Sequence, residues 1–350
     1  MRRIIEVGVV LAAVALIVGL GGPPLARGAE PAEKVAAAKS AAEPVDVFMG
    51  DYEGNFTPAK GASAKAEAKV IAEGVPKGKT NPTYRAVLTL AGDSAVKAEL
   101  SGELAGENLS LASKDGQWTG SLAKGDLAAE AKGDTGGKFD LERIERSSPT
   151  EGQKPPEGAI VLLAFEEGKA PSLDEWVNKT WQVLPDGSMQ VGKRNNLTAK
   201  SFGDCRLHIE FMLPYMPDAR GQGRGNSGVY FQDRYEVQML DSFGLPPKDN
   251  ECGGIYEVAA PKVNACFPPL RWQTYDIEFH TQKFDAEGKV LAPATLTVQH
   301  NGVLIHDKQP VLKETRAAGS KGAVKKGPIM LQDHGCPDRY RNIWILELKD

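Results

Sequence analysis

The hydrophobic and polar positions in the C-terminal half of the chain alternate over several short segments. In residues 205–213 the apolar phase is Cys205, Leu207, Ile209 and Phe211, and the polar phase is Arg206, His208 and Glu210. The same period of two recurs at 228–240, 275–280, 295–299, 303–306, 329–334 and 343–348. This period places alternate side chains on opposite faces of a strand. Residues 159–350 are therefore predicted to form a two-sheet β-sandwich, with Asn301-Gly302 as a hairpin turn.

Residues 45–146 carry a second series of short alternating segments, separated by glycine turns such as the one at 114–116. This spacing predicts a small antiparallel β-meander of six to eight strands. The segment contains no histidine and no cysteine, so it lacks the commonest acid–base groups and soft metal ligands. Two interpretations stay open. Tyr52, Tyr84 and Trp118 either stack on sugar in a cell-envelope-binding accessory module, or they form the core of a spacer.

The first 29 residues are typical of an export signal. Arg2 and Arg3 precede an almost entirely apolar run at 7–20, and the small residues Ala26, Gly28 and Ala29 offer a cleavage site. We expect a periplasmic or extracellular protein, with an uncleaved membrane anchor as the alternative. Residues 30–44, rich in Ala, Lys and Glu, and residues 147–158, rich in Pro, are predicted linkers.

The composition narrows the classes of function. The chain has 42 Lys and Arg against 46 Asp and Glu, a formal net charge of -4. Because no basic residues are clustered, nucleic acid is not an expected partner. All five histidines, all four cysteines and four of the five tryptophans lie in 159–350, which is therefore the predicted working domain.

Three pairs of polar residues two positions apart lie in the polar phase of predicted strands. They are His208 with Glu210, Glu236 with Gln238, and Gln332 with His334. If these strands are neighbours in one sheet, the six side chains line a single face that suits sugar hydroxyls. The alternative is a solvated sheet face without chemistry.

Three ordered parts of the working domain resemble the 3-keto-disaccharide hydrolase domain family. They are GNSGVY (225–230) with RYEVQMLDS (234–242), KVNAC (262–266) before WQTYD (272–276), and GPI (327–329) with LQDHG (331–335) and RYRNIWI (339–345). The resemblance covers about 159–350 and leaves 45–146 outside. It implies a concanavalin-like jelly roll, export, and cleavage of glycosides whose sugar carries a ketone at C3. Three positions depart from the family pattern. An aromatic residue is expected in place of Cys205, Arg in place of Met330, and Asn in place of Cys336.

The implied chemistry starts at the carbon beside the ketone. A C3 ketone acidifies the hydrogen on C2, so a base can remove it and the enediolate can expel the C1 leaving group. We expect Glu236 and His334 to be the catalytic acid and base, in either order. Substrate-binding residues are expected to be His208, Glu210, Asn226, Gln238, Asp241, Gln332, Arg339 and Arg341. No cofactor is firmly predicted, although Glu and His together could hold a divalent metal.

Four cysteines in an exported domain predict two disulfides. We expect Cys252 to pair with Cys266 and Cys205 with Cys336, although four cysteines allow three connectivities. The competing class of function is a non-catalytic, lectin-like module, because jelly rolls often bind sugars without cleaving them. A carbohydrate is the expected ligand in both cases.

Overall fold

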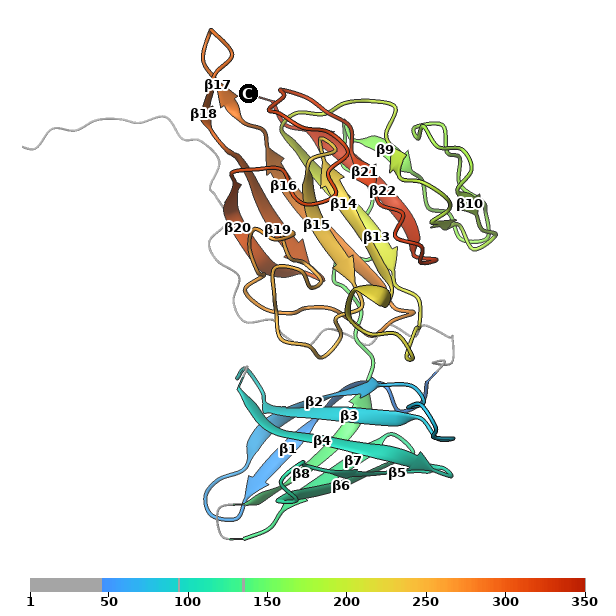
Figure 1. Cartoon of the computed structure of the whole chain (residues 1–350), viewed down its shortest axis with the longest axis vertical. Coiled ribbons are helices and arrows are strands. Elements are labelled where there is room, and N and C mark those ends of the chain that lie inside the picture. Colours follow the sequence, from blue (N-terminus) through green and yellow to red (C-terminus); the bar gives the residue numbers. More distant parts are fainter. Residues whose placement is uncertain (1–45, 94, 134–135, 350) are drawn as a thin grey trace, which may run out of the picture. The chain divides into compact units, whose positions relative to one another are not determined.

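The structure is a computed structural model that describes residues 46–93, 95–133 and 136–349 (Figure 1). Its regular structure is β throughout, apart from the short 3-10 turn η1 (Gly221–Gly223). The predicted export signal and the 30–44 linker lie outside the described residues. Among the residues described, no helix has the length and apolar character needed to cross a membrane. The all-β prediction is confirmed.

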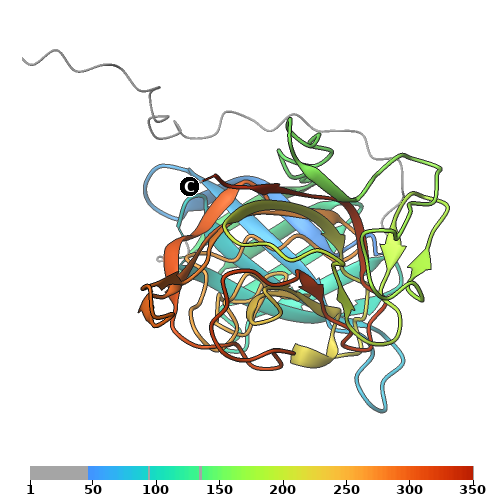
Figure 2. The same cartoon turned by 90° about the horizontal axis from the view of Figure 1, so that it is seen from above.

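The N-terminal module is a closed antiparallel barrel whose strands follow one another in sequence order, drawn in blue to green in Figures 1 and 2. Its strands are β1 (Gly50–Pro58), β2 (Ala64–Ala72), β3 (Thr83–Leu90), β4 (Val96–Ala105), β5 (Asn108–Ala112), β6 (Trp118–Ala123), β7 (Asp126–Ala131) and β8 (Gly137–Ile144). The predicted meander is confirmed. The barrel closes because β1 pairs with both β2 and β8, which removes the exposed edges of an open sheet.

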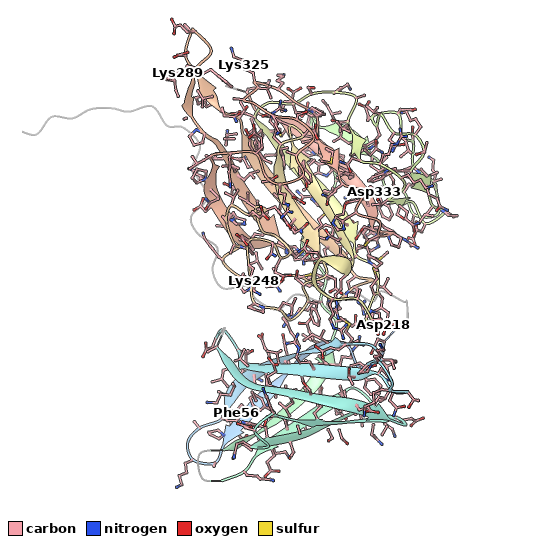
Figure 3. All side chains as sticks on the ribbon, viewed as in Figure 1. Phe56, Asp218, Lys248, Lys289, Lys325 and Asp333 are labelled. Atoms are coloured by element: carbon pink, nitrogen blue, oxygen red, sulfur yellow. The ribbon has the colours of Figure 1, made fainter. Side chains whose placement is uncertain are left out.

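The aromatic residues of this barrel belong to its packing. Tyr52 and Tyr84 are buried. Phe56, labelled in Figure 3, has its ring centroid 4.7 Å from that of Phe139, and the Trp118 ring lies 5.5 Å from Phe139. Rings packed in this way leave little face for stacking on a sugar, which favours the interpretation of these residues as core.

The working domain contains two main sheets. The larger runs in the order β10 (Gln182–Val183), β11 (Met189–Gln190), β22 (Arg339–Glu347), β13 (Cys205–Met212), β16 (Trp272–His280), β19 (Ala294–His300) and β20 (Val303–Val311), with β9 (Ile160–Leu163) also paired to β22. The smaller runs in the order β12 (Asn196–Leu197), β21 (Met330–Leu331), β14 (Asn226–Phe231) and β15 (Tyr235–Leu240). A separate hairpin joins β17 (Lys283–Phe284) and β18 (Val290–Ala292).

The apolar phases of both sheets meet in one core. Ile209 of β13, Val229 of β14 and Val237 of β15 belong to the same buried cluster, and each is fully buried. The predicted two-sheet sandwich and its inward phases are therefore confirmed, while the jelly-roll topology stays a prediction. Because the core lies between the sheets, the polar phases of β13 and of β15 point away from it on two different outer faces.

The predicted disulfides are wrong, because all four cysteines are buried free thiols. Cys205 lies in the sandwich core, where burial raises its pKa. Cys336 is placed elsewhere, with its Sγ 3.3 Å from the carbonyl oxygen of Arg224. Cys252 and Cys266 are close enough to share a thiol hydrogen bond, but they are not joined.

Titration of the denatured, unreduced protein with a thiol reagent is expected to find four thiols per chain. The native protein should react slowly, because burial protects all four groups and keeps Cys205 protonated. Two or fewer thiols in the denatured chain would contradict the free-thiol state.

Candidate functional site

The outer side of the small sheet carries a set of aligned polar side chains. Tyr230 of β14 lies opposite Glu236 of β15, and Gly228 lies opposite Gln238. Asn226, two residues before Gly228, continues the same phase of β14. We call these residues, together with Gln332, the polar face: Asn226, Gly228, Tyr230, Glu236, Gln238 and Gln332. Gln332 joins it after β21, where its backbone N–H donates to the carbonyl oxygen of Gly228 over 3.0 Å.

Glu236 is the titratable group at the centre of the polar face. Its side chain is only 2% exposed, and this burial raises its pKa to about 8, although a hydrogen bond from Tyr230 opposes the shift. The Tyr230 hydroxyl in turn accepts a hydrogen bond from Nε2 of Gln332 over 3.0 Å. A carboxyl group in this environment is mostly protonated at pH 7, so it can donate a proton to a substrate.

The backbone of β15 around Glu236 is held by two loops. Its N–H donates to Oγ1 of Thr315 over 3.0 Å, and its carbonyl oxygen accepts from the N–H of Tyr256 over 3.3 Å. Both bonds lie on the outer edge of β15, the last strand of the small sheet, because the inner edge of β15 pairs with β14. The position of the carboxyl group is therefore fixed by backbone contacts on both sides of the strand.

Gly228 leaves the space that the Glu236 carboxyl group occupies. A Cβ atom added at Gly228 would lie 2.3 Å from Oε1 of Glu236, far inside van der Waals contact. Gly228→Ala is therefore expected to displace the carboxyl group and to lower kcat about tenfold or more. Steady-state kinetics and a thermal melt on the same preparation check this. Unchanged turnover in a normally folded variant would show that the carboxyl position does not matter.

His334, the other predicted catalytic residue, lies on the loop after β21. It is exposed and, among the described residues, makes no hydrogen bond. The same loop carries Asp333, labelled in Figure 3, whose Oδ2 accepts from the backbone N–H of Arg194 over 2.8 Å. The structure therefore joins Glu236 to Gln332 through Tyr230, and places His334 two residues further along the same loop, where a catalytic role for it stays a prediction.

The prediction that His208 and Glu210 share the face of Glu236 is wrong. Both lie on β13, which pairs with β16 and β22 in the large sheet. There Glu210 binds Nε of Arg341 at 2.6 Å, so Arg341 also lies away from the polar face. The guanidinium of Arg341 lies over the ring of Trp272 at 4.1 Å.

This second outer face is covered by the chain itself. The backbone N–H of Gly152 donates to Glu210 over 2.6 Å, and Oγ1 of Thr150 donates to Asp276 over 2.7 Å. The first half of the predicted 147–158 linker is therefore packed against the sheet, whereas residues 154–157 are exposed. Burial lowers the pKa of His208, but Asp276 and Glu210 outweigh it and raise the pKa overall.

Two further predicted binding residues are held in ion pairs. Asp241 is buried and lies 3.2 Å from the guanidinium of Arg224. Arg339 lies 3.1 Å from Asp186. In the described structure neither residue forms a hydrogen bond or an ion pair with Glu236, and their roles in substrate binding stay predictions.

Two residues at this face were not predicted from the sequence: Tyr230, which hydrogen-bonds to Glu236, and Gln222, whose oxygens accept from Nδ2 of Asn226. Tyr230 could have been found, because it shares the phase of Asn226 and Gly228 within one short motif. Gln222 lies in a glycine-rich turn without a period, so only the folded chain brings it to this face. No group of three or more metal-ligating side chains occurs in the described part of the chain, and a divalent metal at Glu236 and His334 stays a prediction.

The polar face lies within a region that matches a known family. The model of the 3-keto-alpha-glucoside-1,2-lyase-like domain matches residues 158–346. The chain belongs to this family. Its membership agrees with the resemblance noted in the sequence, and indicates in broad terms a domain that cleaves glycosidic bonds of carbohydrates.

Solved structures of similar proteins come from Parabacteroides distasonis ATCC 8503, each described as a proposed glycosyl hydrolase. One is 36% identical, covers 55% of this chain and 85% of its own, and has a TM-score of 0.49. Another is 19% identical, covers 55% of this chain and 95% of its own, and has a TM-score of 0.42. No curated protein matches the sequence.

Proposed function

We propose that this family member cleaves glycosides of 3-keto sugars by elimination across C1 and C2, outside the cytoplasm. The observation that carries the proposal is the buried carboxyl group of Glu236 on the polar face, hydrogen-bonded to Tyr230 and with its pKa raised to about 8 by burial. An elimination needs an acid that is protonated at neutral pH, and a carboxyl group reaches that state only when its pKa is raised. Export rests on residues 1–29 alone.

The reaction divides into proton removal and loss of the leaving group. A base takes the hydrogen on C2, and the electrons of that C–H bond move onto the C3 oxygen as an enediolate. The C1–O bond then breaks, a double bond forms between C1 and C2, and Glu236 gives its proton to the departing oxygen. Water later adds across the new double bond, with its oxygen at C1 and a hydrogen at C2, to give the free 3-keto sugar.

The environments of the two predicted catalytic residues favour Glu236 as the acid and His334 as the base. Glu236 holds its proton up to about pH 8, so it is the acid under neutral conditions. His334 is exposed on a loop beside the polar face, and its imidazole is the candidate base. The reverse order would need an ionised Glu236, which predominates only above its raised pKa.

The experiment that tests the proposal compares one glycoside with and without the C3 ketone. Purified protein is expected to release the aglycone from a 3-keto-glucoside and to leave the unoxidised glucoside intact, because only the ketone acidifies the C2 hydrogen. Binding of both sugars without cleavage of either would instead support the lectin-like alternative. Equal cleavage of both would exclude the elimination.

A further inference from the structure

The two most exposed large apolar side chains of the described residues lie at one end of the working domain. They are Leu312, 81% exposed on the segment after β20, and Leu291, 66% exposed on β18. Both line one concave pocket of about 400 Å³, together with Val290 and Pro293. We call these four residues the apolar tip. Leucines gathered in this way, unlike apolar residues scattered singly over a surface, indicate a site of interaction.

The strand pairing brings the apolar tip together. The antiparallel pairing of β19 with β20 continues to the ends of both strands, so Pro293, just before β19, lies beside Leu312, just after β20. β18 forms a hairpin with β17 that projects at this end of the domain in Figure 1. Two buried polar side chains, Tyr235 and Gln282, also line the pocket and are hydrogen-bonded to each other. Their polar groups are therefore paired within the protein, and the pocket offers a ligand mainly apolar surface.

Four lysines surround the apolar tip, and none of them forms an ion pair with another described residue. Each lines the pocket or lies within two positions of a residue that does: Lys289, Lys313, Lys321 and Lys325. All four are exposed, and Figure 3 labels Lys289 and Lys325 at this end of the domain. The nearby Lys283 and Lys326 do have partners, Asp204 at 3.4 Å and Glu347 at 2.8 Å. The ammonium groups of the first four are therefore available to an anion outside the chain.

The charge at this end is opposite to that of the whole chain. Residues 283–292 and 311–326 contain seven Lys and Arg against three Asp and Glu, a formal net charge of +4, whereas the whole chain has -4. Two of the three carboxylates accept hydrogen bonds from the backbone, Asp285 from the N–H of Lys289 over 2.7 Å and Glu314 from the N–H of Gly322 over 2.6 Å. The third, Glu287, is exposed in the hairpin turn. This end therefore attracts anionic surfaces, although the chain as a whole is acidic.

We propose that the apolar tip and its lysines dock on a lipid surface that carries anionic headgroups. The two leucines enter the apolar layer beneath the headgroups, while the lysine stems lie along it and their ammonium groups stay among the phosphates. A protein partner fits less well, because lysine is depleted in protein interfaces. The proposal is independent of the proposed reaction, and adds a membrane surface as a binding partner of the working domain.

The test measures how tightly the full chain binds vesicles of two compositions. One is phosphatidylcholine alone, and the other is phosphatidylcholine mixed with phosphatidylglycerol, which adds negative charge. The affinity of the wild type for the mixed vesicles is expected to be higher by about tenfold or more, because each lysine at the surface adds to the attraction. Raised salt should remove this difference. Equal affinities for the two compositions, or a difference that salt does not change, would overturn the proposal.

Removing the leucines tests the apolar part of the contact. Leu291→Ser combined with Leu312→Ser is expected to weaken binding to the mixed vesicles about tenfold or more, because these side chains no longer enter the apolar layer. The matched control is Val303→Ser combined with Leu304→Ser, at the opposite end of β20, where both side chains are also exposed. Unchanged binding in the leucine variant, or an equal loss in the control, would contradict the role of the apolar tip.

Hydrogen exchange locates the contact on the chain, which matters because the apolar run at 7–20 also has affinity for lipid. Mixed vesicles are expected to slow exchange at 286–293 and 311–325 and to leave 301–306 unchanged. No slowing, or slowing confined to other segments, would overturn the proposal. So would a wild type that binds neither kind of vesicle but forms dimers that Leu312→Ser separates, because the apolar tip would then contact a second copy of the chain.

Discussion

Glu236→Gln is expected to lower kcat/KM on a 3-keto-glucoside by about a hundredfold or more. The amide keeps the size of the protonated carboxyl group but cannot give a proton to the leaving oxygen. Glu287→Gln is the matched control, because Glu287 is exposed on the loop between β17 and β18. Turnover retained in Glu236→Gln, with a normal melt, would remove this residue from the reaction.

The same variant changes the pH dependence of stability. The folded pKa of Glu236 is about 8, above its ordinary value of 4.5, so the folded state binds more protons between those values. The stability of the wild type therefore falls across this range, by about 1.4 kcal/mol per pH unit from this group. Urea unfolding at pH 5 and pH 8 should show that the free energy of unfolding of Glu236→Gln increases relative to that of the wild type as pH rises. Parallel pH curves would contradict the raised pKa.

Glu210→Gln is expected to lower the free energy of unfolding and to leave turnover almost unchanged. Glu210 is fully buried and binds Arg341, Asn342 and the N–H of Gly152. Losing its charge leaves Arg341 without its buried partner, which costs about 3–5 kcal/mol in comparable buried pairs. Activity of the folded fraction should stay within about twofold, because this face is covered by residues 148–153 and the proposed reaction takes place on the other sheet.

Glu347→Gln is the control for this second variant. Its ion pair with Lys326 is similarly short, at 2.8 Å against 2.6 Å for Glu210 with Arg341, but both side chains are exposed. Its loss should cost less than about 1 kcal/mol. Chemical denaturation of the three proteins checks the difference. Normal stability combined with lost turnover in Glu210→Gln would place the substrate on the large sheet instead.

The strands could be predicted from the sequence because a sandwich needs one apolar face on each strand. The segment 205–213 corresponds to β13, and Asn301 and Gly302 have the positive φ angles of 51° and 77° that their hairpin turn requires. The segment 228–240 was expected to be one continuous stretch of alternating residues, but it contains parts of two strands, β14 and β15. Its turn uses Gln232 and Asp233 with positive φ, and no glycine marked it.

The candidate site could be predicted only in part, because alternation gives the face of a strand and not its sheet. His208 with Glu210 and Glu236 with Gln238 have the same local pattern, yet pairing between distant segments places them on different outer faces. The predicted strand at 329–334 shortens to β21, so His334 lies on a loop where the period of two no longer fixes its direction. Barrel closure likewise depends on pairing between residues far apart in the sequence, those of β1 and β8.

Elimination requires that the C2 hydrogen of the substrate leaves during cleavage, and the product formed in D₂O shows directly whether it does. A 3-keto-glucoside is cleaved to a small extent, and the product is compared by mass spectrometry and NMR with free 3-keto-glucose incubated without protein. If cleavage is an elimination, the product carries deuterium at C2, or it has lost the C2 hydrogen and has a double bond between C1 and C2. A product that keeps its original C2 hydrogen would contradict elimination and indicate direct displacement at C1.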